Sequence, residues 1–369
     1  LLEKEGAGIH PICEENNEQG AVDMGGVPEF LPGQIPISSA ADRQRFASAW
    51  HAEIPAAAGS TLPEILERAE RGEIKALYIV GENPLGTLPV SMRVREALEK
   101  IEFIVCQDPF LTETGEMADF VLPAVTFAEK EGTFTDMQGK PNRVSQAFDP
   151  RGEAKPDWKI FCDLSKHLGQ PLLYRGTDEI AQEISQLVPG YYREARTPIS
   201  FDRYLSETFP SEAAGRYGAL SEEMKEEGFP ALLALSRSLY HSGKLTTRDA
   251  GLTKIDDKAA LKIGTADAEA LGLKPEDTVK IKSRQGALEV PIEITPALPK
   301  GLVHFPEHFN RPPVKDLLSG EVDPRTHVPF FKEEPVAIEK VLKFNLAVIT
   351  ASAGPESASE TPQPEGNPS

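Results

Sequence analysis

The feature that most constrains this chain is a series of three short apolar runs, each ending in a glycine, a proline or polar residues. The runs are residues 74–80, 101–106 and 120–122, and a helical pattern over 90–100 separates the first two. Strands that alternate with helices are typical of α/β domains. We therefore expect an α/β domain built on a doubly wound parallel sheet.

Three further segments carry the apolar spacing of amphipathic helices. They are residues 62–71, 157–168 and 178–187, and Gly169 offers a C-terminal stop for the second. We expect the helix over 157–168 to close the α/β domain.

Ligands of open parallel sheets bind beyond the carboxyl ends of the strands. The residues expected there are Gly81-Glu82-Asn83-Pro84, Gln107-Asp108 and Pro123. The first loop combines a flexible turn, a carboxylate and an amide that suit a base or a ribose, but an ordinary strand-to-helix turn explains it equally. Residues 129–135 place charged and hydroxyl groups in a similar loop, which faces either a ligand or solvent.

The second half of the chain changes to short alternating strands from Leu232 onward. Residues 278–283 and 287–292 flank the turn Arg284-Gln285-Gly286, which predicts a hairpin in a β-rich domain. Residues 351–369 contain mostly Pro, Ser, Glu and Gly without an apolar period, so we expect a disordered tail over 346–369.

Charge and hydropathy exclude two classes of partner. The formal net charge of -19 disfavours nucleic acid, because counterion release requires clustered Lys and Arg. No stretch approaches the roughly 20 apolar residues that span a bilayer. We expect a cytoplasmic protein, or one peripheral on the inner membrane face as part of a complex. Since the chain does not start with Met, we expect the natural polypeptide to begin upstream.

The cysteines and histidines offer no self-sufficient reactive site. Cys13, Cys106 and Cys162 lie far apart, which predicts buried reduced thiols rather than a zinc or iron–sulfur site. His304 and His308 have helical metal-ligand spacing, but Pro306 breaks such a helix. His241 beside Ser242 lacks the glycine-framed turn of a hydrolase nucleophile.

The order of several motifs resembles that of a known family. The matching segments are 17–25, 81–84, 107–114, 118–123, 129–135, 239–243, 268–277, 323–324 and 329–332. Over residues 5–342 the chain resembles the molybdopterin oxidoreductases, in particular formate dehydrogenase catalytic subunits and the large subunit of NADH-quinone oxidoreductase. It is similar to the carboxy-terminal portion of these proteins.

The resemblance implies a domain order and a cofactor. Residues 1–40 would belong to the family's middle region, 41–170 to a molybdopterin-dinucleotide-binding α/β domain, 171–231 to a connecting region and 232–345 to a double-psi β-barrel. The cofactor would be bis-molybdopterin guanine dinucleotide with Mo or W. Carried over by motif, the cofactor-binding residues are Gln19, Gly20, Gly81, Glu82, Asn83, Gln107, Asp108, Lys130, His241, Ser242, Gly243 and His308.

The chain also departs from the family pattern. Active members carry a four-cysteine iron–sulfur module and a Cys or selenocysteine metal ligand upstream of the matched region, so this chain should hold no iron–sulfur cluster and no catalytic metal ligand. Lys140 stands where the family commonly has Arg, and Leu317-Leu318 replaces a Leu-Thr step. The resemblance implies an iron–sulfur-bearing domain or subunit and other electron-transfer subunits as partners. The alternative is a cofactor-free scaffold subunit of a complex I-like assembly.

Overall fold

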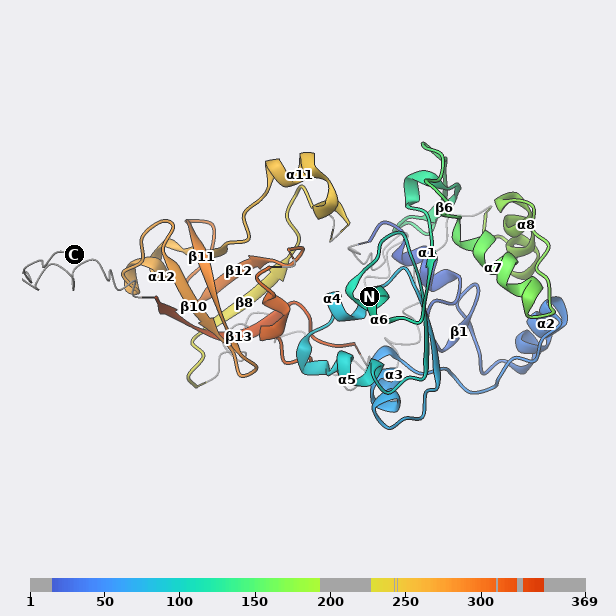
Figure 1. Ribbon diagram of the computed structural model, residues 1–369, viewed down its shortest axis with the longest axis horizontal. Helices are drawn as coiled ribbons and strands as arrows, with labels where there is room; N and C mark the ends of the chain where they lie inside the picture. The colour runs from blue at the N-terminus through green and yellow to red at the C-terminus, as the bar shows by residue number, and fades with distance from the viewer. Residues whose placement is uncertain are drawn as a thin grey trace, which may run out of the picture.

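The computed structural model describes residues 15–192, 227–241, 243, 245–309, 311–323 and 328–341. Figure 1 shows an α/β portion built from the first of these ranges and a barrel built from the later ones. The expected tail over 346–369, Cys13 and Ser242 lie outside the described residues.

A three-stranded parallel sheet forms the centre of the α/β portion. Its order is β3-β4-β5, with Val80 opposite Gln107 and Asp108 opposite Pro123. The parallel sheet confirms the expected class, although these three strands do not by themselves show the reversal of order that defines a doubly wound sheet. The strands are β3 (Ala76–Val80), β4 (Phe103–Asp108) and β5 (Phe120–Pro123).

Helices pack on this sheet through one apolar cluster. Ile79, Ile104 and Cys106 from the strands are buried together with Leu66 and Leu98 from the helices. The helices of this part are α3 (Leu62–Glu70), α4 (Pro84–Thr87), α5 (Val94–Leu98), α6 (Glu113–Met117) and α7 (Asp157–His167). The predicted helices over 62–71 and 157–168 are confirmed, and Gly169 follows the second with a φ of 80°.

Two sequence-based boundaries in the sheet region were wrong. The expected helix over 90–100 is divided into η1 (Val90–Met92) and α5 by Arg93, whose φ is 51°. The break has a structural reason, because the hydroxyl of Ser91 turns to the barrel and donates to the carbonyl of Leu318 at 2.8 Å. Gln107 and Asp108 do not follow the second strand but are its last two residues.

A second apolar cluster joins the start of the described chain to residues near 190. Phe46 is completely buried and packs with Leu31, Leu187, Val188 and Tyr191. The remaining elements of the α/β portion are α1 (Glu18–Asp23), β1 (Phe30–Leu31), β2 (Ile35–Pro36), α2 (Ala40–Trp50), η2 (Phe127–Glu129), β6 (Gly132–Thr135), β7 (Pro141–Val144) and α8 (Thr177–Leu187). The predicted helix over 178–187 is thereby confirmed as α8.

The carboxy-terminal part is a closed barrel with the strand order β10-β11-β9-β12-β8-β13. Its predicted hairpin is confirmed, since β10 and β11 pair antiparallel with Lys282 opposite Ala287. The elements are β8 (Ala231–Ser236), η4 (Thr246–Arg248), α11 (Ala250–Ile255), β9 (Leu261–Gly264), α12 (Thr265–Ala270), β10 (Thr278–Lys282), β11 (Ala287–Thr295), β12 (Leu302–Pro306), η5 (Val314–Leu317) and β13 (Glu333–Lys340).

The barrel meets the α/β portion beside the carboxyl end of the sheet. The ammonium group of Lys315 donates to the carbonyl of Thr87 at 2.9 Å, and the guanidinium of Arg248 lies 4.3 Å from the centre of the Phe110 ring. Together with the bond between Ser91 and Leu318, these contacts define the interdomain seam. The seam lies where ligands of parallel sheets bind.

Two further findings concern the cysteines and the membrane. Cys106 and Cys162 are buried free thiols, as the sequence predicted. Among the described helices, none has the length and apolar character needed to cross a membrane.

The barrel core provides a stability test. Phe305 is fully buried among Leu233, Ile263 and Val303, whereas Phe330 is 52% exposed. We expect Phe305→Ala to lower the free energy of unfolding by about 3–5 kcal/mol, because it removes buried apolar area and leaves a cavity. Phe330→Ala serves as the matched control. Equal effects of the two substitutions in urea unfolding would contradict the assigned core.

Candidate functional site

Gln107 is the buried centre of a partly exposed polar network at the carboxyl edge of the sheet. Its side chain has no exposure, its carbonyl oxygen accepts from the Tyr78 hydroxyl at 2.6 Å, and its amide nitrogen donates to Asp157 at 2.8 Å. The second oxygen of Asp157 accepts a bond from the ammonium of Lys130. The network therefore connects β3, β4, the start of α7 and the loop after η2.

The loop that follows β3 is held by its own hydrogen bonds. The side-chain amide nitrogen of Asn83 donates to a carboxylate oxygen of Glu113 at 2.7 Å, and the side-chain amide oxygen of Asn83 accepts from the hydroxyl of Thr114 at 2.7 Å. Gly81 has a φ of 65°, with open space where a side chain would begin. Glu82 accepts from the hydroxyl of Thr87 at 2.7 Å. Asn83 thus links α4 to α6, which agrees with the ordinary-turn interpretation of this loop.

Asp108 brings the sheet edge and the barrel together. Its carboxylate accepts from the backbone amide of Phe110 at 2.8 Å. Burial raises the pKa of this carboxyl above its ordinary value, although the Phe110 amide and the charge of Arg248 oppose the shift. Arg248, which stacks on the Phe110 ring, belongs to η4 and therefore comes from the barrel part.

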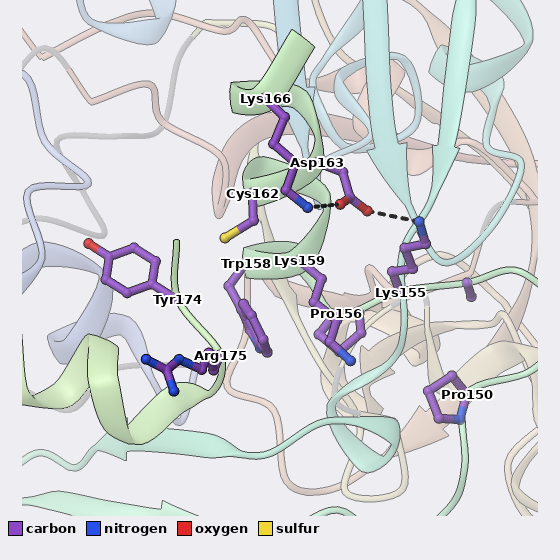
Figure 2. Close-up of a pocket in the computed structure, with 11 residues that line it drawn as sticks. Pro150, Lys155, Pro156, Trp158, Lys159, Cys162, Asp163, Lys166, Tyr174 and Arg175 are labelled. Carbon is purple, nitrogen blue, oxygen red and sulfur yellow. Dashed lines mark hydrogen bonds and ion pairs between the residues drawn. The ribbon is translucent and has the colours of Figure 1, made fainter. Parts of the chain in front are cut away.

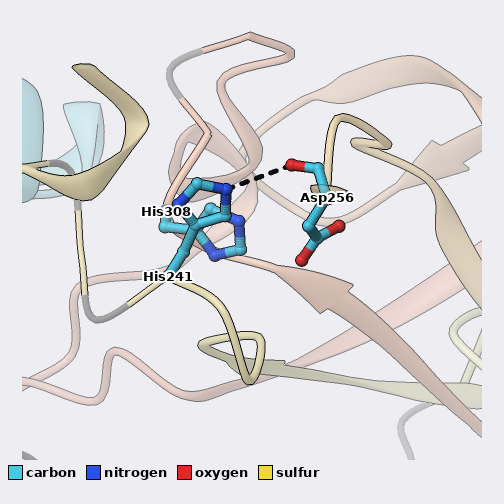
Figure 3. Close-up of side chains that lie close together, drawn as sticks. All are labelled: His241, Asp256 and His308. Carbon is cyan, nitrogen blue, oxygen red and sulfur yellow. Dashed lines mark hydrogen bonds between the residues drawn. The ribbon is translucent and has the colours of Figure 1, made fainter. Parts of the chain in front are cut away.

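Two buried histidines from distant parts of the sequence are stacked against each other (Figure 3). The ring centres of His241 and His308 are 4.6 Å apart with 32° between their planes, and both side chains are at most 1% exposed. The ring nitrogens of His241 bond to the hydroxyl of Thr246 at 3.2 Å and the carbonyl of Asp256 at 3.1 Å. The structure thus brings together two residues that the family resemblance assigned to one site.

His308 is buried without the hydrogen bonds that burial normally requires. Within the described residues, neither of its ring nitrogens has a hydrogen-bond partner, and the hydroxyl of Ser238 is in the same condition. Leaving such groups unpaired costs about 1–3 kcal/mol each, so native structures rarely keep them without a ligand or water. These atoms therefore point to a bound polar group near the histidine pair.

The histidine pair suits a metal ion less well than it suits a bound polar group. Donor atoms of His241, Asp256 and His308 lie within 4.8 Å of one another. Both ring nitrogens of His241 already have partners, so a metal would displace one of these bonds. His304, which the sequence spaced as a ligand with His308, lies on β12 and bonds to Ser236 at 2.7 Å.

A buried carboxylate surrounded by cations lies at the interdomain seam. Glu307 is 7% exposed, and its oxygens lie 2.6 Å from Lys332, 3.6 Å from Lys315 and 3.9 Å from the Nε of Arg237. Burial alone raises the pKa of Glu307, but the hydrogen bond from Lys332 and the surrounding charges outweigh burial and lower it. Arg237 also pairs with Glu15 at 2.5 Å, so three cations face two carboxylates and these five side chains retain one positive charge.

The remaining predicted residues are placed less centrally. Gln19 donates to Asp23 at 2.8 Å within α1. A side chain on Gly20 would come within 2.2 Å of Asn17, whose oxygen accepts from the backbone amide of Thr135 at 2.8 Å. These contacts anchor α1 on β6. Gly243, which follows His241 by two residues, has a φ of 134°.

Sequence reasoning missed several residues of this region. Asp157 was noted only as a possible helix start, and its position after Pro156 gives no hint of its bond to Gln107, 50 residues away. Arg237, Arg248, Glu307 and Lys315 were not singled out, because their roles depend on contacts between the two parts of the chain.

Two family models match the chain over most of its length. The molybdopterin oxidoreductase model matches residues 3–167, and the molybdopterin dinucleotide binding domain model matches residues 236–335.

Individual relatives agree with these models. The F420-dependent formate dehydrogenase 1 subunit alpha of Methanococcus maripaludis is 30% identical over 92% of this chain and 53% of its own length. An NADH-quinone oxidoreductase subunit of Rhizobium meliloti is 31% identical over 84% of this chain and 36% of its own length. The chain therefore spans about half the length of the first relative and less of the second.

A solved structure supports the fold. Acetylene hydratase from Pelobacter acetylenicus superposes with a TM-score of 0.56 at 16% identity, covering 77% of this chain and 47% of its own. At this identity the likeness concerns the fold alone.

The buried histidine predicts a pH dependence of stability. Burial, followed by the nearby charge of His241, lowers the pKa of His308 below its ordinary value. The unfolded chain therefore binds more protons as the pH falls below about 6.5, and stability is lost in that direction. We expect the free energy of unfolding to be lower at pH 5 than at pH 7.5, with a smaller difference in His308→Phe.

The control for this prediction is His51→Asn, at an exposed histidine with a φ of 51°. Urea unfolding of both variants at the two pH values makes the comparison. A pH dependence that His308→Phe leaves unchanged would contradict the assigned environment of this histidine.

Proposed function

Because the chain belongs to the molybdopterin oxidoreductase family, we propose that it forms the carboxy-terminal, cofactor-binding part of a molybdopterin-dependent oxidoreductase that acts in electron transfer. The observation that carries the proposal is the seam itself. There the buried ring nitrogens of His308 have no hydrogen-bond partner among the described residues, and Lys315 of the cationic cluster contacts Thr87 of the α/β portion.

The described residues fit a pterin guanine dinucleotide chemically. Carboxylates such as those of Asp108 and Asp157 accept from the N–H groups of a guanine base, and the amide of Gln107 bonds in both directions. Lys315, Arg248 and Arg237 supply charge that suits a pyrophosphate. The unpaired ring nitrogens of His308 would bond to the pterin, with the His241 ring stacked against His308. Such complementarity explains why cations gather here in a chain with a net charge of -19.

The proposed cofactor-binding residues are those that the family resemblance implied. The structure supports some of them more strongly than others. The contacts above favour Gln107, Asp108, Lys130, His241 and His308. The remaining members belong to the proposal through their motifs alone, and they are Gln19, Gly20, Gly81, Glu82, Asn83, Ser242 and Gly243.

The residues of this chain would hold the cofactor rather than carry out the redox step. When bound, a bis-molybdopterin guanine dinucleotide supplies the metal and the electron-transfer chemistry. The network around Gln107 would orient the nucleotide, because buried Gln107 fixes Tyr78 and Asp157 through its hydrogen bonds. The barrel would cover the bound cofactor and exclude water from it, since Lys315 and Arg248 already contact the α/β portion.

The finer fold and domain assignments belong to the same proposal. The mixture of parallel and antiparallel pairs in the closed barrel supports a double-psi barrel over 232–345. The contacts of the sheet support an α/β domain over 41–170. Residues 1–40, 171–231 and 346–369 keep their proposed roles of middle-region segment, connecting region and tail.

The substrate and the partners follow from the named relatives. We infer formate as the first substrate to test, because relatives such as the M. maripaludis protein are named formate dehydrogenases. The electrons would pass to an iron–sulfur-bearing domain or subunit and then to other electron-transfer subunits. A place in the cytoplasm, or at the inner membrane face within a complex, would suit this role.

One observation favours a second candidate function. The polar groups of Asn83 and Asp157 are already hydrogen-bonded to other residues of the chain, so part of the proposed nucleotide edge is stable without a ligand. This arrangement suits a cofactor-free scaffold subunit of a complex I-like assembly. The R. meliloti relative, which is named as part of an NADH-quinone oxidoreductase, agrees with that alternative.

The nucleotide edge is tested by cofactor retention in the full-length protein. Gln107→Leu removes both buried hydrogen bonds at nearly constant volume, and each bond contributes about 1 kcal/mol. We expect the guanine nucleotide released from purified protein to fall by about tenfold or more. Gln285→Leu, at an exposed glutamine in the barrel hairpin, is the matched control.

Circular dichroism shows whether both variants remain folded. Equal retention in a folded Gln107→Leu protein and in the control would remove Gln107 from the site.

A further inference from the structure

A cationic hollow lies on α7 (Figure 2). Helix α7 is on the side of the α/β portion away from the barrel (Figure 1). It is a cavity of about 400 Å³, which falls within the usual range of small-ligand sites. Its walls come from the approach to α7, one face of α7 and the segment before α8. The lining residues used below are Lys155, Trp158, Lys159, Cys162, Lys166 and Arg175.

Helix α7 separates this cavity from the network around Gln107. Asp157 and Phe161 face the sheet, since Asp157 bonds to Gln107 and the Phe161 ring lies 6.0 Å from that of Tyr78. Trp158 and Cys162, each one residue further on, line the cavity instead. The two sites therefore use different faces of the same helix.

The charge of the cavity is opposite to that of the chain. Four cationic side chains line it, with Asp163 as the single carboxylate. Asp163 accepts from Lys155 at 2.9 Å and from Lys166 at 3.0 Å, and these hydrogen bonds lower its pKa to about 2. The ionised carboxylate keeps the two ammonium groups close together, and the trio retains one positive charge.

An aromatic ring lies beside these cations. The ammonium of Lys159 is 5.5 Å from the centre of the Trp158 ring. Lys159 forms no ion pair with another described residue, so its charge is available to a ligand. An indole beside several cations is a stacking platform next to an anion site, and nucleotides need both features.

We propose that this cavity binds a nucleoside polyphosphate, with its base against Trp158 and its phosphates among Lys155, Lys159 and Lys166. An inorganic anion would use the cations but not the ring. Arg175, in the segment before α8, also lines the cavity but pairs with Glu179 at 3.4 Å, so the proposed phosphate set does not include it. The site is separate from the proposed cofactor edge and does not depend on it.

Calorimetric titration of the full chain with ATP and, separately, with tripolyphosphate tests the site. Because stacking of the base adds to the binding of the phosphates, we expect ATP to bind about tenfold or more tightly than tripolyphosphate. Trp158→Leu should abolish this difference. Lys159→Glu should weaken both probes, whereas Lys100→Glu, at an exposed lysine outside the cavity, should not.

The Gln107→Leu variant separates the two nucleotide sites. ATP binding that survives Gln107→Leu but not Lys159→Glu belongs to the cavity on α7. Loss of binding in Gln107→Leu alone would assign the nucleotide to the sheet edge and overturn the proposal. Absence of saturation, or equal affinity for ATP and tripolyphosphate, would overturn it too. Because Lys159 is exposed, its variant keeps the test valid even if Trp158→Leu fails to fold.

Discussion

The buried amide of Gln107 is the interaction on which the candidate site depends. Its two hydrogen bonds, to Tyr78 and Asp157, cross from β4 to β3 and to α7, with no exposure of the side chain to solvent. Leaving a buried amide group without a partner costs more free energy than its hydrogen bond contributes. The bonds of Gln107 therefore hold all three elements in register. The bond from Gln107 also holds Asp157, at the start of α7, where it pairs with Lys130.

The second constraint is the way in which the barrel covers the sheet edge. Lys315 bonds both to the buried carboxylate of Glu307 and to the end of α4, so one cation connects the two parts of the chain. Burial lowers the pKa of Lys315, and the charge of Glu307 opposes this shift. Arg237, Lys332 and Glu15 join this pair, and the five side chains together retain one positive charge, which suits a pyrophosphate.

Local sequence signals predicted the elements but not their mutual contacts. Short β-branched runs were sufficient for the three parallel strands, and the turn at Gln285-Gly286 was sufficient for the hairpin. The helix over 90–100 was wrong because Ser91 bonds to the barrel at Leu318, an interaction 227 residues away in sequence. Periodicity cannot reveal such a contact.

The same holds for the candidate site: its segments could be predicted from the sequence, but the contacts between them could not. Spacing could not join His241 to His308, and only the family resemblance assigned both to one site; the structure stacks their rings. Asp157 and Lys315 were missed because their significance comes from tertiary bonds.

The central claim is that this seam holds a pterin guanine dinucleotide. Its most direct test is mass-spectrometric metal analysis, with nucleotide release, of the natively purified full-length protein. The account predicts Mo or W with about two guanine nucleotides per metal. A well-folded protein that contains neither would contradict it.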